Sequence, residues 1–154
     1  MRPIRRSKRH ETLVRQLAEV AHPQAGRPIF PTMRELMCFA AVLGFEREQM
    51  KPLDTVTMEI DGRTFEGHDQ SRDVIYLLAL AHEKNVDVLR EEHEDRCLTI
   101  FEQYAEGGFA ELSAWLKERP EDENGDAAIL SALQKRGFLG EARSVDQAVH
   151  DVSF

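Results

Sequence analysis

The spacing of apolar residues predicts that most of this chain is helical. Six segments place an apolar residue at every third or fourth position, which is the period of one face of an α-helix. In the segment over 69–84 the apolar side chains cover most of the circumference, which marks that helix as the central one. We therefore expect a mainly α fold, a compact single-domain bundle of about five to six helices. The six segments are 8–21, 33–43, 69–84, 87–106, 109–118 and 127–136.

Capping and helix-breaking residues mark where several of these helices begin and end. Thr32 is followed three residues later by Glu35, a spacing typical of a capping box at a helix start. Gly44 supplies the left-handed residue that commonly ends such a helix. Gly107 and Gly108 are expected to break the chain into two helices, because glycine weakens a helix interior. These positions predict helix boundaries at 32, 44 and 107–108.

Residues 45–70 lose the helical period. Over 56–60 apolar residues alternate with polar ones, as in a strand with one buried face. Asp61 and Gly62 then form a favourable two-residue turn. The pattern is compatible with one short β-hairpin near 56–66 in an otherwise helical chain.

The charge of the chain is distributed unevenly. The net charge is -8, but residues 1–15 carry six basic side chains against one carboxylate, so the rest of the chain carries -13. We interpret residues 1–9 as a basic N-terminal arm, 10–140 as the helical domain, and 141–154 as a C-terminal tail with room for one short helix. A basic arm on an acidic body approaches polyanions with its end while the body repels them.

The basic arm is the main candidate for function. Six cations would neutralise DNA phosphates, with an affinity that falls steeply with salt and carries little sequence preference. The alternative is a solubilising, disordered terminus with no ligand. We assign nucleic-acid binding to Arg2, Arg5, Arg6, Lys8, Arg9 and Arg15.

A second candidate surface is the exposed side of the helix that follows Thr32. Arg34, Glu35 and Arg47 would flank a groove for a partner protein. The alternative is an ordinary polar helix face, and polar faces of this kind are common on amphipathic helices. Such helices also pack on copies of themselves, which leaves a homo-oligomer open.

No set of residues forms a convincing catalytic or metal site. His93 and Cys97 are spaced to share one helical face, but two ligands do not make a zinc site. Cys38 lies in mid-helix among apolar residues, where a thiol is usually inert. A cryptic nuclease would need a cluster of carboxylates that binds magnesium. We therefore expect no metal, no cofactor and no enzymatic activity.

Nothing in the chain predicts export or membrane insertion. The longest apolar run, over 74–81, is far shorter than the roughly 20 residues that span a bilayer. The basic start leads into no apolar segment of the kind found in secretory signals. The two cysteines are distant in sequence, so no disulfide framework is indicated. We expect a cytoplasmic protein.

Three ordered blocks of the sequence resemble the bacterial DNA phosphorothioation-associated (Dnd system-associated) protein 4 family. The block over 27–45 contains RPIFPTMREL and FAAVLGF, the block over 73–81 contains DVIYL, and the block over 100–109 reads IFEQYAEGGF. The resemblance extends roughly from Arg9 to Leu116 and leaves out the chain beyond Pro120. The resemblance carries over no catalytic residue.

This resemblance implies a role beside the enzymes that replace a non-bridging phosphate oxygen of DNA with sulfur, and beside the restriction proteins that attack unmodified DNA. Our hypothesis is a non-catalytic accessory or regulatory protein of a Dnd-linked restriction-modification and phage-defence system. It would bind DNA weakly through its arm, and other Dnd modification or restriction proteins through its helical body. The alternative is an acidic adaptor or DNA mimic that engages one of those enzymes without binding DNA.

Overall fold

The computed structural model of the chain describes residues 1–140. It is 61% helical, and the described residues form six α-helices and one two-stranded antiparallel sheet, which confirms the expected mainly α fold. The predicted tail over 141–154, with its short helix, lies outside the described residues. The helices are α1 (Glu11–Ala18), α2 (Met33–Glu46), α3 (Arg63–Glu66), α4 (Asp69–Glu83), α5 (Glu94–Glu118) and α6 (Asp126–Lys135).

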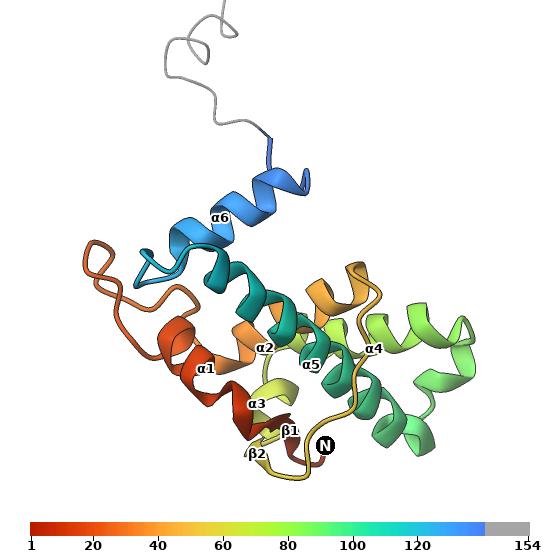
Figure 1. The fold of residues 1–154 in the computed structure, drawn as a ribbon. Coiled ribbons are helices and arrows are strands. Elements are labelled where there is room, and N and C mark those ends of the chain that lie inside the picture. Colours follow the sequence, from red (N-terminus) through yellow and green to blue (C-terminus); the bar gives the residue numbers. More distant parts are fainter. Residues whose placement is uncertain (141–154) are drawn as a thin grey trace, which may run out of the picture.

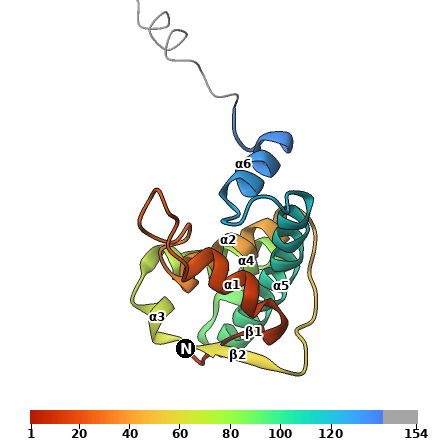
Figure 2. The same ribbon diagram turned by 60° about the vertical axis from the view of Figure 1, so that its left-hand side comes forward.

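The domain is organised around α5, not around α4 as the apolar pattern predicted. Helix α5 packs along α2 and also contacts α4 and α6, and Figure 1 shows it crossing the middle of the molecule in front of α2 and α4. In α4 the side chain of Leu77 is 62% exposed, so one apolar face of that helix is uncovered. Both Figure 1 and Figure 2 place α6 at one end of the molecule and the two strands at the other.

Helix α5 runs for 25 residues straight through Gly107 and Gly108, so the predicted break at these residues is wrong. Both glycines are points of close contact. A Cβ atom on Gly108 would lie 1.7 Å from the carbonyl oxygen of Ala40 in α2, and one on Gly107 would lie 1.7 Å from the carbonyl oxygen of Gln49. Glycine is needed here because the backbone of α2 and of the loop after it touches α5 directly.

The predicted start of α2 is confirmed and its predicted end is wrong. The hydroxyl of Thr32 accepts a hydrogen bond from the N–H of Glu35 at 3.2 Å, as an N-cap does. At the other end the helix continues past Gly44 to Glu46. A Cβ atom on Gly44 would lie 2.0 Å from the carbonyl oxygen of Tyr104, so this glycine also serves helix packing. The left-handed residue after the helix is Glu48, with φ 52°.

The two strands join segments that are far apart in sequence. Strand β1 (Ile4–Ser7) pairs with β2 (Thr57–Ile60) in antiparallel register, with Ile4 opposite Ile60. The predicted strand over 57–60 is therefore present, but the hairpin is wrong, because the residues after the Asp61-Gly62 turn form α3. The expectation of a separate arm over 1–9 is also wrong, since Ile4 is fully buried and residues 4–7 belong to the sheet.

Short 3-10 turns complete the chain trace. They are η1 (Lys8–His10), η2 (Val86–Leu89) and η3 (Glu91–His93), and the last two occupy the start of the segment that the pattern assigned to one helix over 87–106. The core is filled mainly by large side chains from α1, α2, α4 and α5. None of the described helices is both long and apolar enough to cross a membrane. The largest fully buried side chains include Trp115, Phe65, Phe101, Phe109, Leu17 and Leu36.

Candidate nucleic-acid interface

Five of the six residues that the sequence assigns to nucleic-acid binding form ion pairs inside the domain. Two of them converge on one carboxylate of α5. Arg2 Nη1 lies 2.5 Å from Glu102 Oε1, and Arg5 Nη2 lies 3.0 Å from Glu102 Oε2. The backbone N–H of Arg5 also donates to Glu102 Oε1 at 2.8 Å. The protein itself therefore holds these two guanidinium groups.

One helical turn further along α5, a second carboxylate binds the turn η1. His10 Nε2 lies 2.9 Å from Glu106 Oε1, and the guanidinium of Arg9 pairs with the same oxygen. Arg9 Nη1 also lies 3.3 Å from Asp54 Oδ1. The ring of His10 stacks on Phe109, with 5.1 Å between the ring centroids. The contacts fix the start of α1 against α5.

The remaining predicted residues differ from one another in exposure. Arg6 is only 3% exposed, and its Nη2 lies 2.6 Å from Glu11 Oε2. Arg15 is exposed, with its Nε 3.0 Å from the other oxygen of Glu11. Lys8 is exposed and forms no ion pair within residues 1–140. Of the six assigned cations, Lys8 has the greatest freedom to meet a phosphate.

The two carboxylates at the centre of this network were not singled out from the sequence. Glu102 and Glu106 are each 1% exposed, although glutamate is rarely buried unless it is paired. They stand at i and i+4, and the buried Phe109 follows at i+7, so all three share one face of α5. A pair of acids in line with a core aromatic residue is the signal that could have identified them.

The environment of Glu106 lowers the pKa of its carboxyl group to about 2 from an ordinary value of 4.5. Burial alone would raise that pKa, because it disfavours the charged form. The hydrogen bonds from His10, Arg9 and Ser7 outweigh burial and stabilise the carboxylate. Glu106 is therefore a permanent buried anion at neutral pH.

This lowered pKa predicts a specific acid sensitivity. A carboxyl group whose folded pKa lies below its unfolded pKa contributes stability above the unfolded value and loses it as pH falls through the folded value. We expect the free energy of unfolding of the wild type to exceed that of Glu106→Gln at about pH 5, and the difference to shrink between about pH 4.5 and pH 2. Urea unfolding at a series of pH values measures it. A difference that is unchanged across that window would contradict the assignment.

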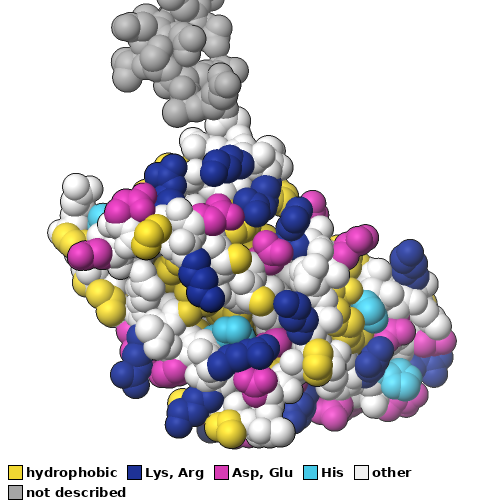
Figure 3. Space-filling model, viewed as in Figure 1, with side chains coloured by type: hydrophobic (Ala, Val, Ile, Leu, Met, Phe, Trp, Pro, Cys, Tyr) yellow, Lys and Arg dark blue, Asp and Glu magenta, His cyan; other side chains and the backbone are white. Residues whose placement is uncertain are grey.

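Four other cations, which the sequence reasoning did not select, are not neutralised in this way. They lie at the end of α5 and in α6, and none of them forms an ion pair within residues 1–140. Figure 3 shows Lys and Arg side chains over α6 and the end of α5, with Asp and Glu side chains among them, and further Lys and Arg side chains across the rest of this face. These residues are Lys117, Arg119, Lys135 and Arg136. Arg119 donates to the hydroxyl of Ser131 at 3.3 Å, and the guanidinium of Arg136 lies over the ring of Trp115. Lys117 and Lys135 are therefore the least engaged of the four.

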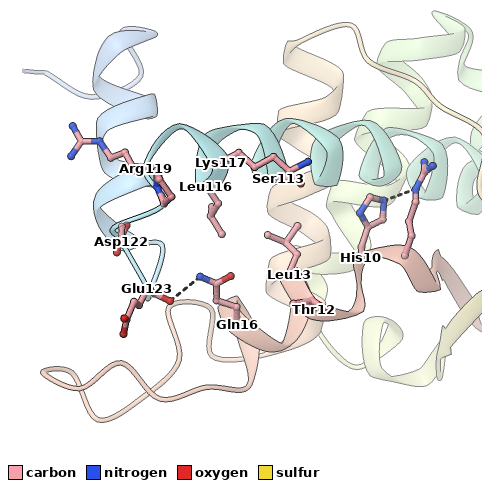
Figure 4. A pocket seen from close by; sticks show the side chains of 12 residues that line it. His10, Thr12, Leu13, Gln16, Ser113, Leu116, Lys117, Arg119, Asp122 and Glu123 are labelled. Carbon is pink, nitrogen blue, oxygen red and sulfur yellow. Dashed lines mark hydrogen bonds between the residues drawn. The ribbon is translucent and has the colours of Figure 1, made fainter.

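A groove of about 420 Å³ runs between α1 and the end of α5. Figure 4 shows Leu13 and Leu116 pointing into it from the two helices, with Lys117 on one wall and Arg119 near the loop that leads to α6. Arg9 and His10 line the opposite end. The groove thus has a small apolar floor and a basic residue at each end.

The polar groups of this groove are mainly donors. Thr12 and Ser113 contribute hydroxyl groups to the lining, and Gln16 donates to the carbonyl oxygen of Glu123 at 2.9 Å. Asp122 is one of two acids in the lining, and its carboxylate accepts from the N–H groups of Gly125 and Ala128 and so caps α6. The other acid, Glu123, is exposed, so the lining holds two carboxylates against the basic side chains of Arg9, Lys117 and Arg119. This excess of positive charge favours an anion over a cation.

The structure does not bring the three predicted partner-binding residues together. Arg34 and Glu35 lie in the first turn of α2, and Arg47 lies at its C-terminal end, roughly 20 Å away along the helix. Arg34 Nε donates to the hydroxyl of Ser71 at 3.0 Å. A shared groove for one partner is therefore not formed by these side chains, and their role in partner binding stays a prediction.

The cysteines and the weak metal pair have ordinary surroundings. The Cys97 thiol is buried and donates to the carbonyl oxygen of Val88, and burial raises its pKa. Burial likewise raises the pKa of Cys38, which disfavours a reactive thiolate. His93 is exposed. In the part of the chain that the structure describes, no three His, Cys, Asp or Glu side chains are grouped as a metal site requires.

Comparison with protein families gives one match. The model of the family described as DNA sulphur modification system-associated protein 4 matches residues 3–147. The match is longer than the resemblance recognised from the three blocks, and it includes most of the chain beyond Pro120, which we had left outside the family. No curated protein and no solved structure shows a significant match to the chain.

Proposed function

Since the chain belongs to the DNA sulphur modification system-associated protein 4 family, we propose that it serves such a system as a non-catalytic accessory protein that binds the DNA backbone. The groove between α1 and α5 is the proposed contact surface. The observation that carries this proposal is the contrast between the two basic regions. Arg2 and Arg5 are paired with Glu102, whereas Lys117 and Arg119 form no ion pair within residues 1–140.

The paired arginines are poor candidates for the same task. To bind a phosphate, Arg2 or Arg5 would have to leave Glu102, which is 1% exposed. If one arginine left, Glu102 would keep the other, but the departing guanidinium would lose a charge-assisted hydrogen bond worth about 1.5–3 kcal/mol. This loss would offset much of the free energy gained from a single phosphate contact. We therefore move the expected DNA contact from the first residues to the groove.

The donor set of the groove fits a phosphodiester. Backbone phosphates are bound in proteins by Lys and Arg together with Ser, Thr and Gln side chains. Lys117, Arg119, Ser113 and Thr12 supply these groups from the two walls. The net charge of -8 repels DNA from the rest of the surface and so favours one orientation of approach. Such binding carries little sequence preference, as suits a protein that acts on many sites.

The double variant Lys117→Gln/Arg119→Gln tests this proposal. We expect its affinity for a 20-base-pair duplex to fall about tenfold at low salt, and the slope of log K against log salt to drop by about 2, because two phosphate contacts are lost. Fluorescence anisotropy at two salt concentrations measures both quantities. The matched control is Arg63→Gln/Arg72→Gln, which changes the net charge equally outside the groove. Equal losses in the two double variants, or no binding by the wild type, would refute the proposal.

We place this activity in the bacterial cytoplasm, beside the modification and restriction proteins of a phage-defence system. The family membership supports association with a DNA sulphur modification system. Other Dnd proteins are the partners that such an association would provide. Co-expression of the gene cluster, followed by purification through this chain, is the direct measurement of those partners.

A second candidate is an acidic adaptor that binds a Dnd enzyme without DNA. It is favoured by η2, where Val86 is 71% exposed and Leu89 is 43% exposed. Asp87 and Glu91 lie in and after this turn and are also exposed, and Asp87 pairs with the exposed Arg90 at 3.2 Å. Apolar side chains with acidic neighbours suit a basic, partly apolar surface on another protein. Retention of a Dnd enzyme by a chain that binds no duplex DNA would favour this candidate.

A further inference from the structure

A second pocket, of about 490 Å³, lies where α2 and α4 end. It is separate from the DNA groove, since no residue lines both. Its apolar lining comes from Phe45 in the last turn of α2, from Met50 in the loop after that helix, from Ala81 in α4 and from Tyr104 in α5. Residues of three helices, α2, α4 and α5, therefore line this pocket.

Tight contacts preform this pocket. The carbonyl oxygen of Gln49, beside Met50, presses so closely on Gly107 that a Cβ atom there would lie 1.7 Å away. The hydroxyl of Tyr104 is 2.7 Å from His82 Nδ1, and its ring meets that of Phe45 edge to face, with 5.3 Å between centroids. The walls are thus set by backbone packing and by a fixed aromatic pair, so a ligand would not have to order them.

The rim of the pocket carries unusual backbone conformations. Two non-glycine residues among those described have positive φ, Glu48 at 52° and Lys84 at 54°, and both line this pocket. The left-handed position after a helix is usually taken by glycine or asparagine. Here long charged side chains occupy it at the ends of α2 and α4. Residues with strained backbone conformations are often found at binding sites, where the function of the side chain offsets the cost of the strain.

The electrostatics of the pocket favour a cation. Each helix C-terminus carries a partial negative charge, and two of them meet here. Glu46 and Glu48 add two carboxylates, against the single charge of Lys84. Burial raises the pKa of Tyr104, and the charge of Glu48, which lines the same pocket, raises it further. The pocket combines negative charge with aromatic and methylene surface.

We infer that this pocket receives an arginine side chain from a partner protein. The methylene stem would pack on Met50 and Ala81 while the guanidinium group reaches Glu48. Arginine suits the site better than lysine because its planar group is weakly hydrated and stacks against aromatic rings. The inference does not depend on DNA binding, because the groove between α1 and α5 plays no part in it.

A titration of the full chain with N-acetyl-arginine amide tests the inference, with N-acetyl-citrulline amide as the uncharged probe of nearly equal shape. Nuclear magnetic resonance follows the backbone amides of Met50, Ala81 and Lys84. We expect saturable shifts at millimolar arginine amide and none with citrulline amide. Equal shifts with both probes, or no saturable shift with either, would overturn the inference.

Two variants separate a binding role from a structural one. Glu48→Gln is expected to weaken arginine amide binding about threefold, as loss of a partly exposed ion pair does. Lys84→Gln is expected to strengthen it about twofold, since a like charge leaves the rim. The control Glu59→Gln, on β2 and outside the pocket, should leave the affinity unchanged. A gain in affinity cannot arise from damage to the fold, so weaker or unchanged binding by Lys84→Gln would count against the site.

Discussion

The variant Gly108→Ala is expected to lose about 3 kcal/mol or more of its free energy of unfolding. The added Cβ atom would lie 1.7 Å from the carbonyl oxygen of Ala40, far inside van der Waals contact. The carbonyl oxygen belongs to the backbone of α2, and the position of a Cβ atom is fixed by the backbone of α5, so no side-chain rotation can relieve the overlap. Helices α2 and α5 would have to separate and open the core. Urea unfolding followed by circular dichroism measures the change.

A loss of stability in Gly108→Ala would run against helix propensity, because alanine stabilises an exposed helix by about 1 kcal/mol relative to glycine. The direction of the change therefore distinguishes close packing from helix propensity. Gly67 is the matched control, since its φ is -72° and a Cβ atom there would meet its nearest neighbour at 3.4 Å. We expect Gly67→Ala to be neutral, or more stable by about 0.5 kcal/mol. If Gly108→Ala unfolds at the same urea concentration as Gly67→Ala, the backbone contact between α2 and α5 does not exist.

The variant Glu106→Gln is expected to destabilise the protein by about 3 kcal/mol at neutral pH. The substitution preserves the shape of the side chain and removes its charge. Arg9 and His10 would then face a neutral amide in place of a fully buried carboxylate. The loss arises because charge-assisted hydrogen bonds from Arg9 and His10 to a buried carboxylate are replaced by weaker bonds to an amide. Arg9 itself is half exposed and keeps Asp54 as a partner. Thermal and urea unfolding both report the loss.

A second glutamate on α5 provides the comparison. Glu111 is 21% exposed at its side chain and its carboxylate lies 4.0 Å from Arg47, which is a weak surface pair. Pairs of this kind contribute about 0–1 kcal/mol. Glu111→Gln should therefore change stability much less than Glu106→Gln. Similar values for the two variants would show that the network at Glu106 contributes no more than surface charge does.

The helices were predictable because their signals are local. Helix α4 was expected over 69–84 and spans Asp69–Glu83, and α6 was expected over 127–136 and spans Asp126–Lys135. The cap at Thr32 depends on a residue three positions away and was found for the same reason. The helical period and the capping box both involve residues that lie a few positions apart. Both signals can therefore be recognised in a single sequence without knowledge of the fold.

The glycines were misinterpreted because their function depends on a neighbour that is distant in sequence. Locally, Gly44 and the pair Gly107-Gly108 look like helix ends. In the fold, each leaves room for a backbone carbonyl of another segment. Helix propensity and close packing both select glycine, and only the position of the second segment tells them apart. Tertiary packing here overrides a propensity cost of about 1 kcal/mol per residue.

The candidate site was harder to predict than the fold. Counting charges identified a basic segment, but not whether its charges are free. The partners of Arg5 and Arg9 both lie 97 residues further along the chain. Exposure of Lys117 and Arg119 likewise depends on how α5 meets α1 and α6. No local pattern encodes these relationships, so the expected DNA contact moved from one end of the domain to the other.

The position of β1 sets the order in which the nascent chain can fold. Glu102, which pairs with Arg2 and Arg5, is synthesised 97 to 100 residues after them. The ribosome needs about 5–20 s to add that many residues. Through that interval Arg2, Arg5 and Arg9 lack the buried carboxylates of α5 that pair with them. Arg6 differs, because its partner Glu11 follows only five residues later. The domain therefore cannot complete its folding until the ribosome has synthesised α5.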